Sequence, residues 1–152
     1  MGYEVIDGKG IIPDGTKEIG ESAFKGCTCL QSIVIPNCVT KIGKSAFDGC
    51  TGLQSIVIPN SVTTIEEWTF YGCTSLQSIV IPDSVTTIGD GAFSSCSSLQ
   101  SIEIPNSVTR IGDWVFDYCD NLTSITVSKN NPNYKSINNS ILTKDGKKLI
   151  SC

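Results

Sequence analysis

The sequence predicts a repeat solenoid, a right-handed coil in which short parallel strands stack into a sheet along one face. Three observations carry this prediction. Apolar residues recur every 23 residues over most of the 152-residue chain. Each unit contains a β-branched run that ends in proline, and one unit alone is too small to bury its own apolar side chains. Stacked units bury them together, with neighbouring strands about 4.8 Å apart.

Five columns of like residues define the unit. Leucine, isoleucine and phenylalanine form its apolar frame, while proline and cysteine occupy two further positions. The members are Leu30, Leu53, Leu76, Leu99 and Leu122; Ile33, Ile56, Ile79, Ile102 and Ile125; Phe24, Phe47, Phe70, Phe93 and Phe116; Pro36, Pro59, Pro82 and Pro105; Cys27, Cys50, Cys73, Cys96 and Cys119.

The run LQSIVIP at residues 53–59 is the predicted strand of one unit. Ile56 shares one face with Ile58, and Val57 lies on the other face, because successive side chains of a strand alternate. Pro59 has no N–H group to donate and ends the strand. We expect five such strands between residues 30 and 127 in one parallel sheet, with an exposed edge at each end.

The rest of each unit returns the chain to the next strand. In residues 61–65, SVTTI, the spacing of Val62 and Ile65 turns both inward from a second extended segment. Phe70 and Cys73 are three residues apart, which is the spacing of one helical or 3₁₀ turn. We therefore expect short helical or 3₁₀ turns on the face opposite the strands.

Both ends of the chain depart from the repeat, as the ends of a solenoid do when they are capped. Residues 3–12 predict a hairpin around Asp7-Gly8, and residues 140–150 predict another around Asp145-Gly146. The chain thus divides into an N-terminal cap with a degenerate repeat (1–18), the repeat array (19–127) and a C-terminal hairpin cap (128–152). It stops directly after an apolar strand, where we expect a cut inside a longer protein.

Composition argues against several classes of function. The chain contains no histidine, which removes the commonest general base and the Ser-His and Cys-His nucleophile pairs. A net charge of −4 lacks the basic footprint of nucleic-acid binders, and no apolar run approaches the ~20 residues that cross a bilayer. We expect no enzyme, no metal or cofactor site, no nucleic-acid partner and no membrane insertion.

The five cysteines of the repeat are predicted to be buried, reduced packing residues. Their side chains all point the same way, so their Cβ atoms stay about one coil apart instead of approaching to disulfide distance. Cys29, Cys38 and Cys152 lie outside this column. A bridge between Cys29 and Cys38 and a pair of free thiols in place of serine both remain open.

Two surfaces are candidates for binding a partner. On the outward face of the strands, Val34, Val57 and Val80 are followed in the same column by Glu103. This strip either seats a partner or reflects the strand propensity of valine. In the variable turn, Trp68 and Trp114 occupy one column, with Tyr71 and Tyr118 close by. Such aromatic residues either anchor a partner or cover a neighbouring coil.

The pattern I-P-x-x-V-x-x-I-G-x-x-A-F-x-x-C, which runs through residues 12–127, resembles the leucine-rich repeats of BspA-like proteins, the class also named after the Treponema pallidum repeat. The resemblance implies a horseshoe-like leucine-rich repeat solenoid. It also implies a secreted or surface-anchored bacterial protein that binds host matrix proteins or other cells. Similar repeats in Trichomonas leave the organism open. Glu66 in place of glycine, and Thr69 and Val115 in place of alanine, are modest departures.

Two functional hypotheses follow. The first is a non-catalytic protein-interaction module of a bacterial cell-surface adhesin, whose partner is a host extracellular matrix or cell-surface protein. The second is a structural spacer that holds another domain away from the cell. The near-identity of the strand columns favours the spacer slightly, because a selective binding face varies along its length.

Overall fold

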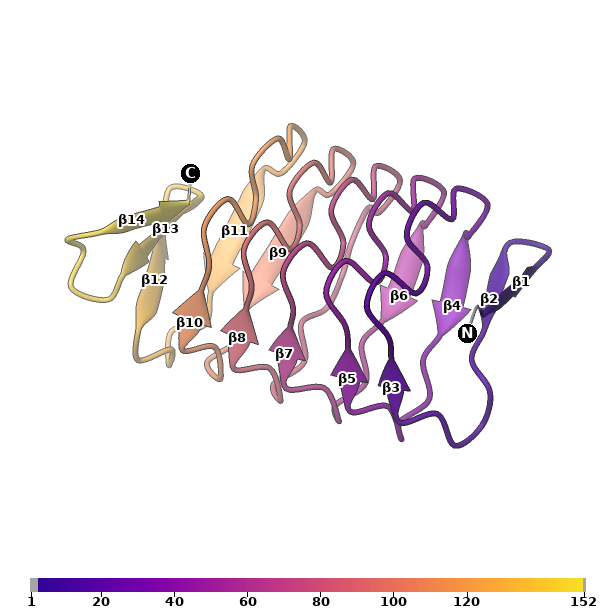
Figure 1. Ribbon diagram of the computed structural model, residues 1–152. Helices are drawn as coiled ribbons and strands as arrows, with labels where there is room; N and C mark the ends of the chain where they lie inside the picture. The colour runs from indigo at the N-terminus through magenta and orange to yellow at the C-terminus, as the bar shows by residue number, and fades with distance from the viewer. Residues whose placement is uncertain (1–2, 152) are drawn as a thin grey trace.

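A computed structural model describes residues 3–151 and has the form of a β-solenoid of about five turns. Successive coils lie side by side along one axis, with the N-terminal hairpin at one end and the C-terminal strands at the other (Figure 1). The fold class predicted from the repeats is confirmed as a leucine-rich repeat solenoid. The division of the chain at residues 18 and 127 stays a prediction.

The long strands of the coils form the strand face of the solenoid. Parallel pairing matches residues one repeat apart, as in Ile33 with Ile56 and Ile102 with Ile125. The N-terminal hairpin joins the first sheet, in the order β1-β2-β4-β6, and β9 and β11 form a second pair. The strands are β1 (Glu4–Ile6), β2 (Lys9–Ile11), β4 (Ser32–Val34), β6 (Ser55–Val57), β9 (Ser101–Ile104) and β11 (Ser124–Val127).

The prediction of one unbroken sheet of five strands is wrong in the third repeat of the array. Residues 79–81 form no strand, and only an isolated bridge joins Ser78 to Ser101. The sheet is therefore interrupted between β6 and β9. The sequence LQSIVIP at residues 76–82 is identical to that at 53–59, which contains β6. Local sequence therefore does not explain the difference.

A second row of short strands confirms the second extended segment of each unit. Each of these strands contains one isoleucine, and each of these isoleucine side chains is at least 92% buried. They pair in parallel as β3-β5 and as β7-β8-β10. These strands are β3 (Glu18–Ile19), β5 (Lys41–Ile42), β7 (Thr64–Ile65), β8 (Thr87–Ile88) and β10 (Arg110–Ile111).

The expectation of helical or 3₁₀ turns is not supported, because residues 3–151 contain no helix. In the coil at 43–50, three amides bond back by three residues, each at 3.1 Å: those of Ala46, Asp48 and Cys50. The amides between them bond instead to the next coil, at 2.8–3.0 Å: those of Ser45, Phe47 and Gly49. Ser45 and Gly49 have φ of 57° and 72°, which no 3₁₀ helix accommodates. The turn segment is therefore a chain of β-turns bonded between coils.

Stacked aromatic rings run through the core along the solenoid axis. Consecutive phenylalanine rings lie 5.3–5.8 Å apart at interplanar angles of 4–9°. Tyr3 extends this stack beyond Phe24 at 5.1 Å and so closes its N-terminal end. Such contacts add to the free energy gained from apolar burial.

The C-terminal cap is a three-stranded antiparallel sheet, β12-β13-β14, of β12 (Tyr134–Ile137), β13 (Ser140–Thr143) and β14 (Leu149–Ser151). The hairpin expected around Asp145-Gly146 is the β13–β14 pair. The strand β12 precedes this hairpin, and no strand is predicted there from the sequence. It packs next to β11 and places the cap against the last coil.

Asn131 connects the cap to the open end of the solenoid. Its side chain is fully buried, and its Nδ2 donates to the carbonyls of Pro105 and Val108, each at 2.9 Å. Its Oδ1 accepts from the amides of Asn133 and Tyr134, also at 2.9 Å. At Val108 this side chain takes the place of the next coil, since Ser84 of the next coil donates to the equivalent carbonyl of Val62. It also anchors the start of β12.

Replacing this side chain tests the cap. We expect Asn131→Ala to lower the free energy of unfolding by about 3 kcal/mol, because buried carbonyls and amides lose their partners. Urea unfolding measures the change, and Asn130→Ala, at an exposed neighbouring position, is the matched control. Equal stability of the two variants would contradict this role for Asn131.

Candidate protein-binding surfaces

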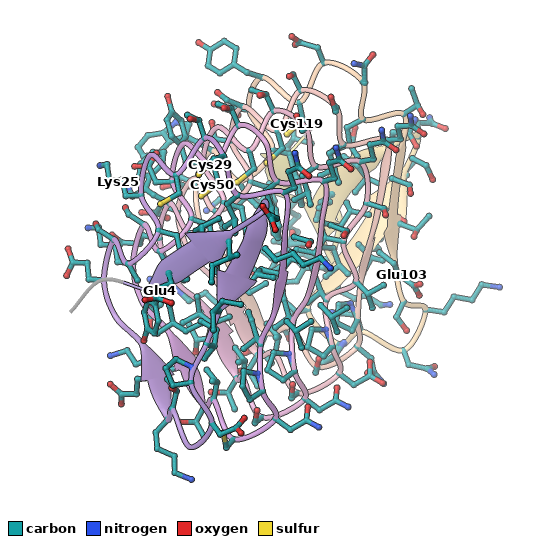
Figure 2. The ribbon with its side chains drawn as sticks, turned by 90° about the vertical axis from the view of Figure 1, so that its right-hand side faces the viewer. Glu4, Lys25, Cys29, Cys50, Glu103 and Cys119 are labelled. Carbon is teal, nitrogen blue, oxygen red and sulfur yellow. The ribbon has the colours of Figure 1, made fainter. Side chains whose placement is uncertain are left out.

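The outward side chains of the strands form an apolar row that we call the valine strip: Val34, Val57 and Val80. Each is 77–81% exposed, although each alternates with buried isoleucines. Val34 and Val57 are directly paired across β4 and β6. Glu103 continues the column on β9 and is exposed on the strand face (Figure 2). The sequence prediction of an outward strip is thus reproduced in the geometry, whereas its binding role stays a prediction.

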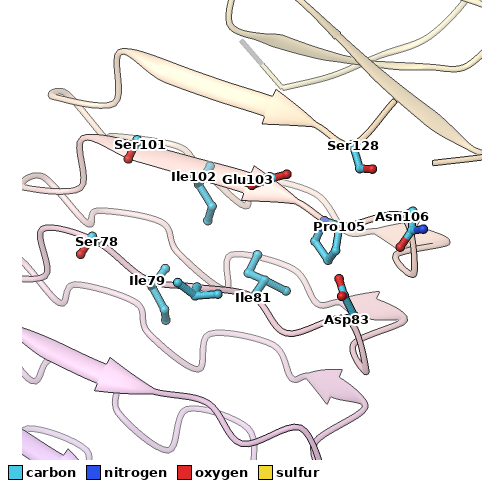
Figure 3. Close-up of a pocket in the computed structure, with 11 residues that line it drawn as sticks. Ser78, Ile79, Ile81, Asp83, Ser101, Ile102, Glu103, Pro105, Asn106 and Ser128 are labelled. Atoms are coloured by element: carbon cyan, nitrogen blue, oxygen red, sulfur yellow. The ribbon is translucent and has the colours of Figure 1, made fainter. Parts of the chain in front are cut away.

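Two shallow grooves flank Val80. One, of about 700 Å³, lies where the sheet is interrupted, between β6 and residues 78–83, and Val57, Pro59 and Pro82 contribute to its wall. The other, of about 600 Å³, lies between residues 78–83 and β9. Figure 3 shows its polar end, where Asp83, Asn106 and Ser128 lie beyond Glu103. The outward column is therefore apolar along the valine strip and becomes acidic at Glu103.

The aromatic residues predicted in the turns lie on the turn face, formed by residues 20–29 and their equivalents in later coils. Lys25, on this face, and Glu103 lie on opposite sides of the molecule (Figure 2). The structure brings Trp68, Tyr71 and Trp114 together as the aromatic cluster. Trp68 meets Trp114 at 6.5 Å between ring centroids and 16° between planes, and Tyr71 edge-on at 5.6 Å and 84°. Tyr118 is 75% exposed and pairs with none of the described rings.

The sequence leaves two roles open for the tryptophans, covering a neighbouring coil or anchoring a partner, and the two residues differ in this respect. Trp68 is half-buried and covers the next coil: a Cβ atom at Gly91 would lie 2.0 Å from its Cζ3. Trp114 is 57% exposed. One ring thus packs on a neighbouring coil, while the other is presented to solvent beside it.

The backbone at these aromatic residues is left-handed, which sequence reasoning missed. The φ angles of Trp68 and Trp114 are 57° and 58°, and that of Tyr118 is 57°. Bulky side chains rarely adopt this conformation, and its cost is on the order of 1 kcal/mol. The signal was present in the sequence, since Gly91 shares the column of the tryptophans and Gly72 shares that of Tyr118.

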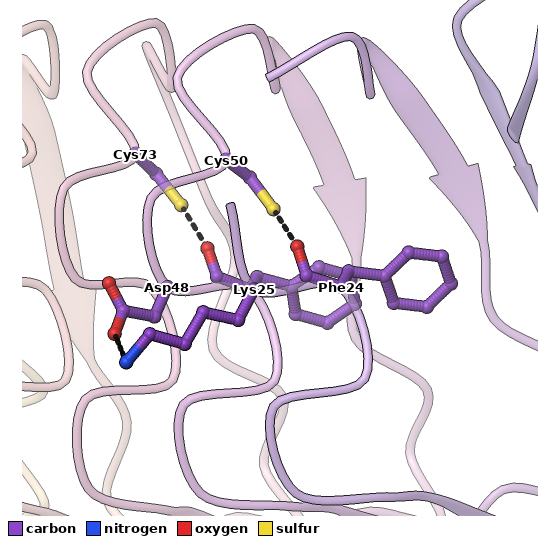
Figure 4. A network of polar contacts seen from close by, with 6 residues as sticks. Phe24, Lys25, Asp48, Cys50 and Cys73 are labelled. Atoms are coloured by element: carbon purple, nitrogen blue, oxygen red, sulfur yellow. Dashed lines mark hydrogen bonds and ion pairs between the residues drawn. The ribbon is translucent and has the colours of Figure 1, made fainter. Parts of the chain in front are cut away.

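The thiols of the repeat form a buried ladder. Cys50, Cys73 and Cys96 are fully buried, and Cys27 and Cys119 at the ends are partly buried. Each Sγ after the first donates to a phenylalanine carbonyl of the preceding coil, as Cys50 does to Phe24 at 3.1 Å (Figure 4). The same picture shows the surface ion pair of Lys25 with Asp48, at 2.9 Å.

Burial makes these thiols unreactive. It raises the pKa of Cys50 to about 12 and that of Cys119 to about 11, and it raises the pKa values of Cys27, Cys73 and Cys96 as well. The thiolate, which is the nucleophile and metal ligand, is therefore scarce at neutral pH. The predicted packing role of the column agrees with this geometry.

The remaining cysteines differ from the ladder. Cys29 and Cys38 are both free, so the bridge considered between them is absent. The Cys38 Sγ donates to the carbonyl of Thr16, 22 residues earlier, at 3.2 Å. The Ser84 hydroxyl, in the same column, donates in the same way to the carbonyl of Val62, 22 residues earlier, at 2.7 Å. Cys29 is exposed, and Cys152 lies outside the described residues.

Within residues 3–151, no three histidine, cysteine or carboxylate side chains are grouped so that they could hold a metal ion. The same part of the chain has no helix of the length and apolarity that a membrane span requires. The features that remain are surfaces: the valine strip with its grooves and the aromatic cluster.

Thiol labelling tests the ladder. Among the seven described cysteines of the native protein, iodoacetamide is expected to modify Cys29 first, because Cys29 is exposed whereas the ladder thiols are buried and protonated. Cys50, Cys73 and Cys96 are expected to react only after unfolding in urea. Peptide mapping by mass spectrometry measures both, and native reaction of Cys73 as fast as that of Cys29 would contradict the packing role.

Stability is expected to fall above pH 9. Because the pKa of Cys50 rises from about 9 to about 12 on folding, the unfolded chain loses this proton first as pH increases. When the pH is raised from 8 to 10.5 with a reductant present, the free energy of unfolding of Cys50→Ala should fall by about 2 kcal/mol less than that of the wild type. Urea unfolding at the two pH values measures this, with Cys29→Ala as the exposed control. An equal loss in wild type and Cys50→Ala would refute the linkage.

Comparison with known proteins places this geometry in a family. Residues 11–145 match the model of the BspA type leucine rich repeat region in six copies. A search of curated proteins finds no match. Among solved structures, a leucine rich cell surface protein from Faecalibacterium prausnitzii is 42% identical, with a TM-score of 0.75, over 79% of this chain and 31% of that one.

Two further structures are similar. The leucine-rich repeat protein of T. pallidum is 41% identical, with a TM-score of 0.72, over 75% of this chain and 54% of its own. A leucine-rich repeat protein from Bacteroides ovatus is 42% identical, with a TM-score of 0.69, over 71% of this chain and 28% of its own. The chain thus spans between about a quarter and about half of the length of these relatives. This chain belongs to the BspA-type leucine-rich repeat family.

Proposed function

We propose that this protein is a non-catalytic protein-interaction module of a bacterial cell-surface adhesin. Its partner is an extracellular matrix or cell-surface protein of a host. The observation that carries the proposal is the valine strip: three side chains, aligned over successive coils and each 77–81% exposed. Apolar side chains that are exposed in a row, with grooves beside them and polar groups at the rim, are typical of protein-binding surfaces.

The family supports the general part of the proposal. Leucine-rich repeats generally mediate protein–protein interaction, and repeat families of this kind are typically non-enzymatic. The F. prausnitzii relative is described as a cell surface protein, and this supports a surface or secreted location here. The whole-protein context belongs to the proposal, because the chain spans only part of its relatives.

The protonated ladder thiols and the residue composition support binding rather than catalysis. The ladder thiols are protonated at neutral pH, and the chain contains no histidine to activate a hydroxyl group. The groove lined by Val57 and Val80 is shallow and open, which suits an extended protein surface better than a small substrate.

Binding of the purified protein to immobilised collagen, fibronectin and laminin tests the proposal. We expect saturable binding to at least one of them, weakened about tenfold in Val57→Gln plus Val80→Gln, because the strip loses its apolar surface. Biolayer interferometry measures the affinity.

The matched control is Thr63→Gln plus Thr86→Gln, two exposed positions outside the strip. It should bind as the wild type does. Equal binding by both double variants would remove the strip from the interface. No binding to any matrix protein would favour the alternative, a structural spacer. The near-identity of the strand columns supports that alternative.

A further inference from the structure

We propose that the aromatic cluster of the turn face binds cationic side chains of a protein partner, with arginine favoured over lysine. The proposal rests on the protein-binding function above but concerns a different surface from the valine strip. Three features carry it: a pair of tryptophan rings, a column of acids beside them, and a middle stretch of chain with almost no basic residues.

The tryptophan pair can receive one cation on two rings. The ring centroids of Trp68 and Trp114 are 6.5 Å apart, and their planes differ by 16°. Cation–π attraction acts over the face of a ring within about 6 Å of its centroid, so a flat cation between the two stacked rings is within reach of both faces. Tyr71 supports the edge of the Trp68 ring at 5.6 Å. Arginine is favoured because its planar guanidinium also stacks on aromatic faces.

The cluster is held in place before any partner arrives. Gly91 leaves the space that the Trp68 ring fills, since a Cβ atom there would lie 2.0 Å from Cζ3. The Trp68 amide donates to the Asp90 carbonyl at 2.9 Å, and the Gly91 amide donates to the Asp113 carbonyl at 2.8 Å. A preformed ring pair loses little conformational entropy on binding.

Acidic residues adjoin the tryptophan column along the chain. Glu67, Asp90 and Asp113 each directly precede the column that contains Trp68, Gly91 and Trp114. Glu67 is paired with Lys44 at 2.7 Å, whereas neither Asp90 nor Asp113 forms an ion pair within residues 3–151. The Asp90 Oδ1 accepts from the Asp113 amide at 2.8 Å. Asp113 is exposed, and its carboxylate forms neither an ion pair nor a hydrogen bond with the rest of residues 3–151, so it is the acid of this column that is available to a cationic partner.

The charge of the surrounding coils strengthens the same preference. Residues 45–128 contain nine acidic residues and one basic residue, Arg110, so their net charge is −8, against −4 for the whole chain. This field attracts cationic segments and repels nucleic acid and other anions. The acids are Asp48, Glu66, Glu67, Asp83, Asp90, Glu103, Asp113, Asp117 and Asp120.

Folding alone gives no reason for tryptophan at the exposed position. Trp114 is 57% exposed and has the left-handed φ that Ser22, Ser45 and Gly91 also adopt in this column. Small residues therefore satisfy the turn at lower conformational cost. Exposed tryptophan beside a second aromatic ring is a common binding hot spot.

The experiment uses the whole chain and a fluorescein-labelled peptide of alternating glycine and arginine. Trp68 and Trp114 are the only tryptophans in the chain, so tryptophan fluorescence, excited where tyrosine does not absorb, reports on the cluster alone. We expect the peptide to bind at low salt and to change this fluorescence. A peptide with citrulline in place of arginine, which has the same shape without the charge, should bind about tenfold more weakly by anisotropy.

Variants separate the rings from general charge attraction. Trp68→Ala plus Trp114→Ala changes no charge and should weaken binding of the arginine peptide about tenfold. Gly91→Ala keeps both tryptophans but displaces the Trp68 ring, and should weaken it about threefold. Thr51→Ala plus Thr74→Ala, at exposed positions of the same turns, should leave binding unchanged. Urea unfolding verifies that each variant is folded.

Several results would overturn the proposal. Equal binding of the arginine and citrulline peptides by the wild type would exclude charge recognition, and this comparison depends on no variant. Equal affinity of the wild type and the folded double tryptophan variant would reduce the binding to general charge attraction. Binding of cellohexaose, with a fluorescence change and no response to the arginine peptide, would assign the cluster to a neutral glycan.

The two proposed surfaces can fail separately. Val57→Gln plus Val80→Gln should retain arginine-peptide binding, because the strip and the cluster lie on opposite faces. Loss of matrix binding in that variant with the peptide still bound would support both proposals. Absence of matrix binding in the wild type, with the peptide bound through the tryptophans, would reject the proposed matrix partner and leave the cationic site standing.

Discussion

The structure depends on the register of neighbouring coils, in which every residue lies beside its equivalent 23 positions away. Alternate amides of the turn segments donate to the next coil instead of closing helical turns, so the coils are joined by hydrogen bonds on the turn face as well as on the strand face. Each apolar side chain then packs against the same type of residue in the neighbouring coil. The phenylalanine stack and the thiol ladder both follow from this register.

Such an arrangement leaves the outermost coil at each end without a neighbour, and the two ends are closed differently. At the N-terminus, the β1–β2 hairpin adds a strand and Tyr3 adds a ring. At the C-terminus, side chains replace the missing coil: Asn131 accepts and donates in the core, and the Tyr134 hydroxyl accepts from the Ile111 amide at 3.0 Å. The caps thus reproduce, with few residues, what a further repeat would supply.

The repeat columns were sufficient to predict the solenoid, its inward residues and the buried thiols, and the Asp-Gly pairs at both ends predicted the terminal hairpins. The turn geometry was not predictable in this way, because Phe70 and Cys73 have the same three-residue spacing in a β-turn as in a 3₁₀ turn. What separates the two is where the intervening amides donate, which depends on the next coil. The interruption of the sheet at residues 79–81 was beyond sequence reasoning, since the same seven residues form β6 one coil earlier. The left-handed column of the tryptophans could have been found from Gly91.

The thiol ladder also has a consequence for where this fold can exist. None of the seven described cysteines is bridged, so the coils among residues 3–151 are held by packing and hydrogen bonds that do not change with redox potential. The ladder thiols are spaced by the repeat and cannot approach one another without breaking the register. A protein built in this way can assemble in a reducing cytosol and keep the same core in an oxidising environment, without an oxidase to form bonds or an isomerase to correct them.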